Sequence, residues 1–186
     1  YQQSLEEKVE QRTKELNIKN EELFKLSITD KLTGLYNRVK LDSVLQENMS
    51  LSLRYGNIFS VIIIDIDFSK KINDNFGHQV GDDVLKECSY ILSQNIRNVD
   101  TLGRWGGEEF LVVCPETLKD GAKDLAIKLN KAIKLHKFST YPHSVTISVG
   151  VASCSVNDLN YDDIISNADK ALYEAKNNGR DRVEIF

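Results

Sequence analysis

The segment from Ile58 to Asp65 constrains the fold of this chain more than any other feature of the sequence. It is a nearly continuous run of β-branched and aromatic residues that ends in an acid. Such a run is typical of a central strand that is buried on both faces of its sheet. A strand of this kind needs helices packed on the sheet. A chain of 186 residues with 41% hydrophobic residues can supply the core that this packing requires.

The remaining elements alternate around this strand. Gly106 and Gly107 are the strongest hairpin signal in the chain, and we expect two short strands to flank them. Helices are predicted over about 38–49, 81–95, 119–136 and 161–177, and further strands over 144–152 and 182–186. The order α-β-α-β-β-α-β-α-β predicts a central sheet with helices packed on it, in the α/β or α+β class.

Residues 1–28 differ from the rest of the chain. They contain no glycine or proline and are rich in Glu, Lys, Gln and Leu. A heptad seam with two charged interruptions runs along them, through Leu5, Val9, Arg12, Leu16, Lys19, Leu23 and Leu26. This pattern favours a two-stranded parallel coiled coil. The alternative is a single amphipathic helix packed on its own domain. We therefore expect two parts, a signalling helix over 1–28 and a globular domain over 29–186.

Charge and composition exclude several classes of function. A net charge of −4 gives no general attraction to nucleic acid or to an anionic membrane, so any phosphate site must be local. The three cysteines are far apart in the sequence, which argues against a zinc site or a disulfide framework. No stretch approaches the ~20 apolar residues that span a bilayer. We expect a cytoplasmic fragment whose missing N-terminal region decides the input signal and any membrane anchor.

Acidic residues occur at two places where a strand ends. Asp65 and Asp67 close the buried run, and their spacing directs both carboxylates to one face. Glu108 and Glu109 directly follow the diglycine. A cation between the two glutamates and the strand aspartate would relieve their repulsion, and hard oxygen ligands in this number suit Mg²⁺ together with substrate phosphates. Taken singly, each feature also fits a purely structural role, as a hydrated strand end or as an exposed hairpin tip.

Two further segments carry groups that suit a nucleotide. Backbone N–H groups between Lys70 and Asp82 can hold phosphates, while Asn73 and Asp82 can read a base edge. Guanine offers two adjacent donors to a carboxylate. Lys176 and Arg180 near a helix end can neutralise a triphosphate. The structural alternatives are that Asn73 forms a turn, that Asp82 caps the next helix, and that the two cations only complement the dipole at the helix C-terminus.

Six segments, taken in order, are similar to one known family. They are Asp30–Arg38, Asp65–Asp74, Phe76–Asp82, Gly106–Phe110, Ala168–Tyr173 and Ala175–Arg180. Together they resemble the GGDEF family, the diguanylate cyclases, over about 29–186. Glu108 stands where the family name has Asp. The resemblance implies a mostly antiparallel central sheet flanked by helices, like the palm of nucleotidyl cyclases and polymerases. The segment Lys8–Leu16 looks like the linker that joins sensory domains to this catalytic domain.

The resemblance also implies roles for individual residues. Asp65, Glu108 and Glu109 would be catalytic, and the same three residues with the carbonyl of Ile66 would bind Mg²⁺, or Mn²⁺ as a substitute. Glu108 would help to deprotonate the ribose 3′-OH. The substrate-binding set would be Phe68, Ser69, Lys70, Asn73, Asp82, Gly107, Lys176 and Arg180. Arg97 and Asp100 match an inhibitory R-x-x-D motif that would bind the product; the alternative there is a surface ion pair.

The implied activity is the condensation of two GTP molecules into cyclic di-GMP and two pyrophosphates at a homodimer interface. The N-terminal helix would bring the two half-sites together. A different hypothesis is a catalytically silent module that only binds GTP or cyclic di-GMP. The acids of the diglycine motif argue against that module. Asp82 argues against a cyclase that also accepts ATP, since promiscuous members that resemble this pattern carry Ser there.

Overall fold

The computed structural model describes the backbone of residues 2–155 and 157–186, and side chains from Lys8 onward except at residue 156. The expected seam residue Leu5 therefore lies outside the described side chains. The elements follow in the order α1 (Gln2–Ile28), α2 (Arg38–Tyr55), β1 (Phe59–Ile66), α3 (Ser69–Phe76), α4 (His78–Asn95), β2 (Thr101–Gly106), β3 (Glu109–Pro115), α5 (Lys119–Leu135), β4 (Ile147–Ser153), α6 (Tyr161–Asn177) and β5 (Val183–Ile185).

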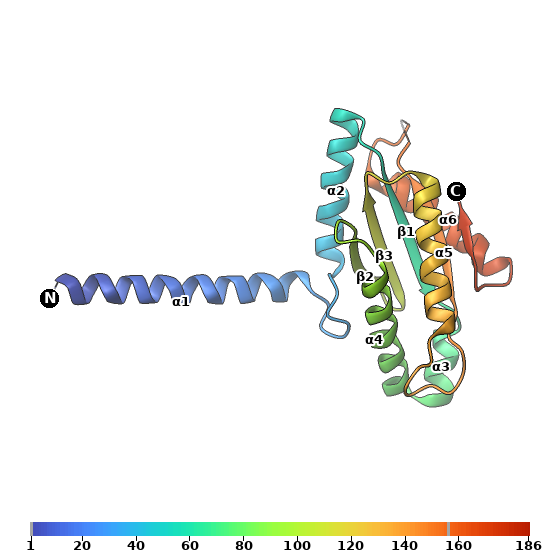
Figure 1. The fold of residues 1–186 in the computed structure, drawn as a ribbon, viewed down its shortest axis with the longest axis horizontal. Helices are drawn as coiled ribbons and strands as arrows, with labels where there is room; N and C mark the ends of the chain where they lie inside the picture. Colours follow the sequence, from blue (N-terminus) through green and yellow to red (C-terminus); the bar gives the residue numbers. More distant parts are fainter. Residues whose placement is uncertain (1, 156) are drawn as a thin grey trace.

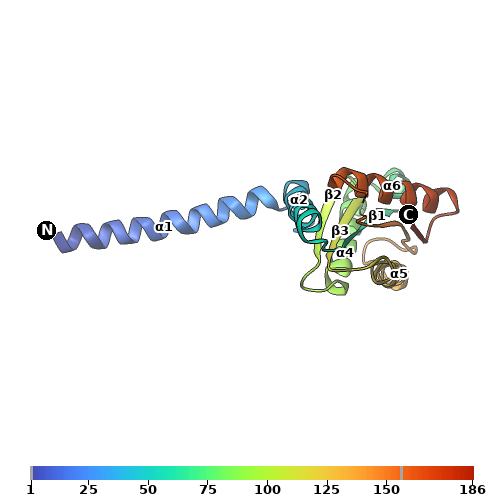
Figure 2. The same ribbon diagram turned by 90° about the horizontal axis from the view of Figure 1, so that it is seen from above.

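The strands form one sheet in the order β2-β3-β1-β4-β5. β1 is the central strand and pairs antiparallel with both β3 and β4, while β4 and β5 pair in parallel. Figures 1 and 2 show the helices on both faces of this sheet, with α2 and α6 on one side and α4 and α5 on the other. The expected fold class, a mostly antiparallel sheet flanked by helices, is confirmed.

The core follows from the alternation of β1. Every residue of this strand is buried. Phe59, Val61 and Ile63 pack in the layer that contains α2 and α6. Ile62 and Ile64 pack in the layer that contains α4 and α5. Since side chains alternate along a strand, Asp65 belongs to the α2 and α6 side of the sheet. A central strand with two buried faces explains why its sequence shows no alternation of polar and apolar residues.

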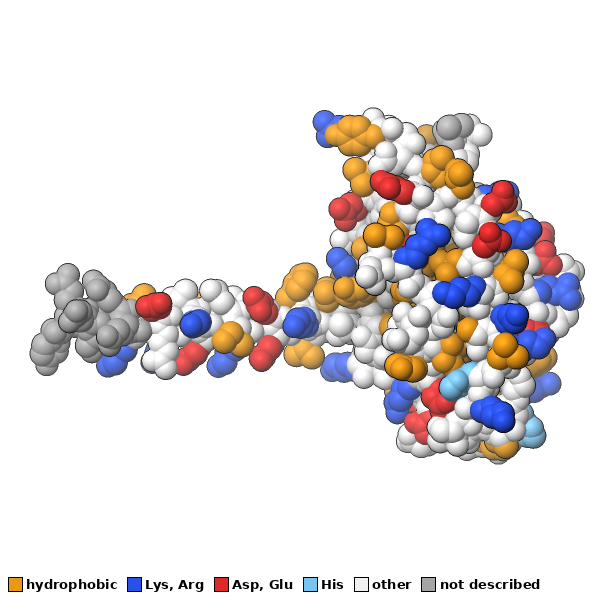
Figure 3. Space-filling view, viewed as in Figure 1, with side chains coloured by type: hydrophobic (Ala, Val, Ile, Leu, Met, Phe, Trp, Pro, Cys, Tyr) orange, Lys and Arg blue, Asp and Glu red, His pale blue; other side chains and the backbone are white. Residues whose placement is uncertain are grey.

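Helix α1 extends away from the domain as a single rod (Figure 1). Its described apolar side chains are largely exposed, among them Val9, Leu16, Leu23 and Leu26 of the predicted seam. Acidic, basic and hydrophobic side chains are interspersed along it (Figure 3). The chain does not pack this helix on its own domain, so the alternative of a packed amphipathic helix is wrong. No helix in the described part of the chain is long and apolar enough to cross a membrane.

The sequence pattern did not predict one helix, and the ends of several predicted helices differ from those in the structure. The sequence pattern predicted no helix over α3, whose Asn73-Asp74-Asn75 run is typical of turns. Tertiary packing overrides that preference, with Ile72 of α3 buried in the core. α2 continues to Tyr55, where Gly56 ends it in the left-handed conformation. α4 begins at His78, three residues before the expected start.

Candidate active site

A cavity of about 330 Å³ lies at the end of the central strand β1. Three segments far apart in the sequence meet there: the β1–α3 junction, the diglycine hairpin between β2 and β3, and the end of α6. Its lining residues are Asp65, Ile66, Phe68, Ser69, Lys70, Lys71, Asp74, Glu108, Lys176 and Arg180. The structure thus brings together most of the residues that the sequence marked as catalytic or substrate-binding.

Two of the acids face each other across neighbouring strands. Asp65 on β1 lies directly opposite Glu109 on β3. Like charges in this position repel each other and destabilise a sheet. Lys176 of α6 offsets the repulsion, with its Nζ 2.9 Å from Oδ2 of Asp65. This arrangement shows that the position beside Asp65 attracts a cation.

The pKa values of both acids reflect this environment. Burial raises the pKa of Asp65 above its ordinary value, and the ion pair with Lys176 opposes the rise. Burial also raises the pKa of Glu109, and the negative charge of Asp65 adds to the effect. The two carboxylates are therefore not fully compensated by protein groups alone, and additional positive charge would stabilise their ionised forms.

The diglycine hairpin carries the third acid. Gly107 has a φ of 49°, which favours glycine, and a side chain placed at either Gly106 or Gly107 would point into open space. This open surface lets a ligand approach the hairpin backbone closely. Glu108 is held from the other side of the cavity, where the Ser69 hydroxyl donates to its Oε1 at 2.7 Å.

The start of α3 presents free backbone donors to the cavity. The first backbone bond of the helix runs from Ile72 N–H to the Phe68 carbonyl, at 3.1 Å. The N–H groups of Ser69, Lys70 and Lys71 consequently have no carbonyl within the helix to bind, which is the usual basis for anion binding at a helix start. Phe68 adopts the left-handed conformation with a φ of 57°. The Arg180 guanidinium stacks 4.7 Å from the centre of its ring.

The charges around the cavity suit a polyphosphate bound with a metal ion. Its lining includes four basic side chains and three acidic ones. Among the described residues, no three His, Cys, Asp or Glu side chains gather closely enough to form a metal cage of their own. Mg²⁺ does not need such a cage, since it usually binds through one or two carboxylates plus substrate phosphates. The oxygen donors of Asp65, Glu108 and Glu109 fit this mode of binding.

A small pocket adjoins the main cavity beside Asn73. Its lining includes Asn73, Gly81 and Glu108. The structural alternatives for the two candidate base readers are wrong. Asn73 lies inside α3 rather than in a turn, and Asp82 lies four residues inside α4, whose cap is Gly77. Asp82 itself is half-buried and follows Gly81 along the helix.

Sequence reasoning did not assign a role to Asp67, which the structure shows as an anchor. Its side chain is only 4% exposed. It accepts hydrogen bonds from the hydroxyls of Thr146 (2.7 Å) and Ser148 (2.6 Å) and from the N–H of Asp181 (3.0 Å). Asp67 therefore fixes the turn that follows α6, which holds the neighbouring Arg180 against the cavity. The feature of the sequence that could have indicated this role is the two-residue spacing of Asp65 and Asp67 at the end of the strand.

Arg97 and Asp100 lie in the connection between α4 and β2. They form no ion pair: the Asp100 Oδ2 accepts from the backbone N–H of Arg97 at 3.0 Å, and the Arg97 side chain is exposed. Asp100 is 8% exposed, and its Oδ1 has no hydrogen-bond partner among the described residues. Since β2 separates this turn from the hairpin, the two sites lie about 20 Å apart.

Comparison with known proteins identifies the domain. Residues 27–182 match the family model described as "Diguanylate cyclase, GGDEF domain". The response regulator PleD of Caulobacter vibrioides is 38% identical over 163 residues, which are 85% of this chain and 36% of PleD. The chain thus spans about a third of that relative's length.

Two solved structures extend the comparison. The coiled coil and GGDEF domain of DgcB from Caulobacter crescentus, in complex with c-di-GMP, matches with a TM-score of 0.89 and 27% identity; the match covers 98% of this chain and 100% of that one. The active GGEEF domain of a diguanylate cyclase from Vibrio cholerae matches with a TM-score of 0.77 and 36% identity, over 81% of this chain and 96% of that one.

Proposed function

The chain belongs to the GGDEF family of diguanylate cyclase domains, and from this premise we propose that it condenses two GTP molecules into cyclic di-GMP and two pyrophosphates. The observation that carries the proposal is the cavity at the end of β1. It combines carboxylates that protein groups compensate only in part with a helix start and basic side chains, so it offers partners to each part of a nucleoside triphosphate.

Each domain would bind one GTP in a fixed orientation. The backbone N–H groups at Phe68, Ser69 and Lys70 are proposed to hold the phosphates. Lys176 and Arg180 would neutralise the phosphate charge from the α6 side. Asn73 and Asp82 would hydrogen-bond the guanine edge, and Gly107 would let the ribose lie against the hairpin. The positions of these residues around one cavity and its adjoining pocket support this pose.

The reaction then consists of two equivalent displacements. The 3′-oxygen of one GTP attacks the α-phosphorus of the other, a phosphodiester bond forms, and pyrophosphate leaves. The 3′-OH proton passes to a carboxylate, which we assign to Glu108 because it borders the cavity on the hairpin side. The second displacement closes the ring in the same way. The protein contributes mainly positioning and charge stabilisation.

A divalent cation is part of this proposal. Asp65, Glu108, Glu109 and the carbonyl of Ile66 would hold Mg²⁺, with Mn²⁺ as a substitute. When bound, the metal would polarise the phosphate oxygens and offset the charge that develops on them. The pair between Lys176 and Asp65 supports the assignment, since it marks this position as one that attracts positive charge.

The reaction needs two domains, and α1 offers the means to join them. We propose that residues 1–28 form a dimerising signalling helix and that residues 29–186 form the catalytic domain. The exposed seam residues Val9, Leu16 and Leu23 support a coiled coil with a second copy. Pairing of this kind raises the effective concentration of the two half-sites. A sensory domain that precedes α1 would act by changing how the two helices pair.

Product inhibition is proposed at Arg97 and Asp100. The exposed guanidinium of Arg97 can pair with a phosphate or with guanine. The unpartnered Oδ1 of Asp100 is buried, so the Asp100 side chain must turn outward to contact a bound nucleotide. An Asp side chain accepts from the N1–H and 2-amino groups of guanine. Since the site lies about 20 Å from the hairpin, a nucleotide bound there would act at a distance rather than by filling the active site.

The decisive experiment is the incubation of the chain with GTP and Mg²⁺, followed by chromatography and mass spectrometry of the products. Glu109→Ala should abolish cyclic di-GMP formation. Asp124→Ala, which removes an exposed acid from α5, should not. If the unaltered chain yields no product, the assay is repeated at tenfold higher protein concentration. Activity per molecule that stays at zero would support the alternative of a silent binding module over a cyclase with a weak dimer.

A further inference from the structure

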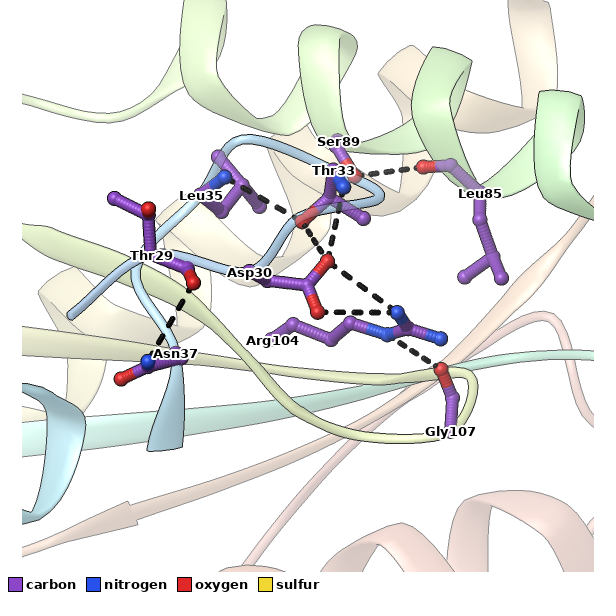
Figure 4. A network of polar contacts seen from close by, with 9 residues as sticks. All are labelled: Thr29, Asp30, Thr33, Leu35, Asn37, Leu85, Ser89, Arg104 and Gly107. Atoms are coloured by element: carbon purple, nitrogen blue, oxygen red, sulfur yellow. Dashed lines mark hydrogen bonds and ion pairs between the residues drawn. The ribbon is translucent and has the colours of Figure 1, made fainter. Parts of the chain in front are cut away.

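We propose that Asp30 and Arg104 are positioning residues that brace the diglycine hairpin and tie it to the end of α1. The inference rests on the proposed cyclase activity, since it concerns the hairpin that carries Glu108. Asp30 lies two residues beyond the end of α1, which is called the stalk from here on, and Arg104 lies on β2. Figure 4 shows the Arg104 side chain beside the Asp30 carboxylate and reaching across to Gly107.

The hairpin needs support beyond the strand ladder. The pairing of β2 with β3 is irregular between Arg104 and Gly106, and two glycines form its tip. Glycine has the greatest backbone freedom in the unfolded or loosened state, so such a tip does not hold one geometry by itself. The Nε of Arg104 donates to the carbonyl of Gly107 at 2.8 Å, and this bond links the end of β2 to the tip of the hairpin.

Asp30 orients the arginine that makes this bond. The Nη1 of Arg104 donates to both carboxylate oxygens, at 3.3 Å to Oδ1 and 3.2 Å to Oδ2. The two side chains are only 20% and 22% exposed, so the pair is shielded from water and more effective than a surface ion pair. Asp30 in turn accepts from the N–H and the hydroxyl of Thr33, at 2.9 and 2.7 Å.

The pKa of Asp30 agrees with this geometry. Burial acts to raise the pKa of this carboxyl, but the bonds from Thr33 and the charge of Arg104 outweigh burial and hold the pKa below its ordinary value. The carboxylate is therefore ionised and oriented in the folded chain, as a brace requires.

The same segment holds the end of the stalk. The N–H of Asn37 donates to the carbonyl of Ile28, the last residue of α1, at 2.8 Å, and the Asn37 side-chain amide donates to the carbonyl of Ser27 at 2.8 Å. Tyr36 is bound on β2, because its carbonyl accepts from the Arg104 N–H at 2.8 Å. A side chain at Gly103 would lie 2.6 Å from that carbonyl, so glycine is needed for the contact.

These contacts form a continuous path from α1 to the hairpin. Residues 28–37 are bonded at one end to the stalk and at the other to Arg104, which is bonded to Gly107. A rotation or displacement of the stalk end would shift Asp30 and therefore the orientation of the Arg104 side chain. The catalytic hairpin would respond to the way in which the stalk enters the domain.

The test uses the full chain and three variants. Asp30→Asn keeps an acceptor for Thr33 and removes the charge. Arg104→Lys keeps the charge and removes the fork that bonds two partners at once. The matched control is Glu87→Gln, since Glu87 likewise holds a loop through Ser139 and His136 and its pKa is also lowered. Hydrogen exchange, thermal unfolding and steady-state kinetics are measured for each.

We expect the two brace variants to speed amide exchange at residues 104–110 about tenfold and to lower kcat about tenfold, with KM for GTP changed less than about twofold. Glu87→Gln should lower thermal stability without either effect. Arg104→Lys should also speed exchange at residues 29–37, although it lies outside that segment.

Hairpin exchange and kcat that match the Glu87→Gln control would overturn the role as a brace. Faster hairpin exchange with unchanged exchange at 29–37 in Arg104→Lys would overturn the tie to the stalk. Failure of the proposed function gives a different result: the unaltered chain makes no cyclic di-GMP, while the exchange data still decide whether the brace exists.

Discussion

Substitution of Gly81 by alanine should weaken nucleotide binding while it leaves the fold intact or slightly more stable. Gly81 lies in the first turns of α4 with an ordinary helical backbone. A Cβ placed there would be 1.8 Å from Oδ1 of Asn73 and 3.0 Å from its Cγ. The Asn73 amide must therefore move by more than an ångström, which a flexible side chain can do at little cost.

The expected effects on stability and binding have opposite signs. Alanine is better than glycine inside a helix by up to about 1 kcal/mol, so the midpoint of unfolding should rise by about 2–4 °C or stay unchanged. A displaced Asn73 amide can no longer bond guanine as proposed. The loss of one neutral hydrogen bond costs about 1 kcal/mol, which is about a fivefold increase in KM for GTP.

A control variant and a double-mutant cycle test the role of Asn73. Gly121→Ala places a methyl group in the first turn of α5, where its nearest neighbour is the Thr117 methyl at 3.3 Å. It should change stability without any effect on KM. In an Asn73→Ala background, Gly81→Ala should have no further effect on KM, because no amide remains to be displaced. An unchanged KM in the single variant, or an equal increase in both backgrounds, would refute the role of Asn73.

Three further predictions concern packing, pH and regulation. Gly150→Ala places a Cβ 2.1 Å from the carbonyl oxygen of Ala168, and this backbone atom cannot rotate away. The substitution should therefore cost about 3 kcal/mol and lower the melting midpoint by about 6–12 °C. A melting midpoint within about 2 °C of the unaltered chain's would contradict the contact. Burial acts to raise the pKa of Glu87, but its bonds to Ser139 and His136 leave it below the ordinary 4.5, so its stabilisation is present above that value and is lost as pH falls through the lowered pKa. Glu87→Gln should therefore lower the melting midpoint at pH 7 and have little effect at the acid limit of folding; equal effects at both would exclude this linkage. Arg97→Ala should raise the half-inhibitory concentration of cyclic di-GMP about tenfold in the cyclase assay, and an unchanged value would remove Arg97 from the proposed product site.

The central strand and the diglycine hairpin could be predicted because each depends on local sequence. A β-branched run can hardly be anything but a buried strand, and two adjacent glycines between strand-forming segments specify a turn. α3 could not be predicted in this way. Its residues prefer turns, and only the packing of Ile72 under α4 and the sheet makes the helix favourable.

The candidate site was predictable as a set of residues but not as a set of contacts. Spacing alone places Asp65 and Glu109 at strand ends, yet their pairing across β1 and β3 depends on register. The contact of Lys176 with Asp65 crosses more than a hundred residues of sequence, and that of Arg104 with Asp30 crosses 74. Such contacts leave no periodicity in the sequence, which explains why the sequence alone indicates no role for Asp30 or Asp67.

The position of Lys176 over Asp65 follows from the close packing of α6 on β4. Gly150 lets the backbone of α6 approach the sheet at Leu172, where a Cβ would come within 2.4 Å of the Leu172 nitrogen. Lys176 lies one helical turn further, about 6 Å along the axis. Ser148 lies two residues back along β4, about 7 Å, and pairs with Asp65. These two displacements match, so Lys176 lies above the pair formed by Ser148 and Asp65. The glycine that allows this approach is a packing residue, yet the charge balance of the site depends on it.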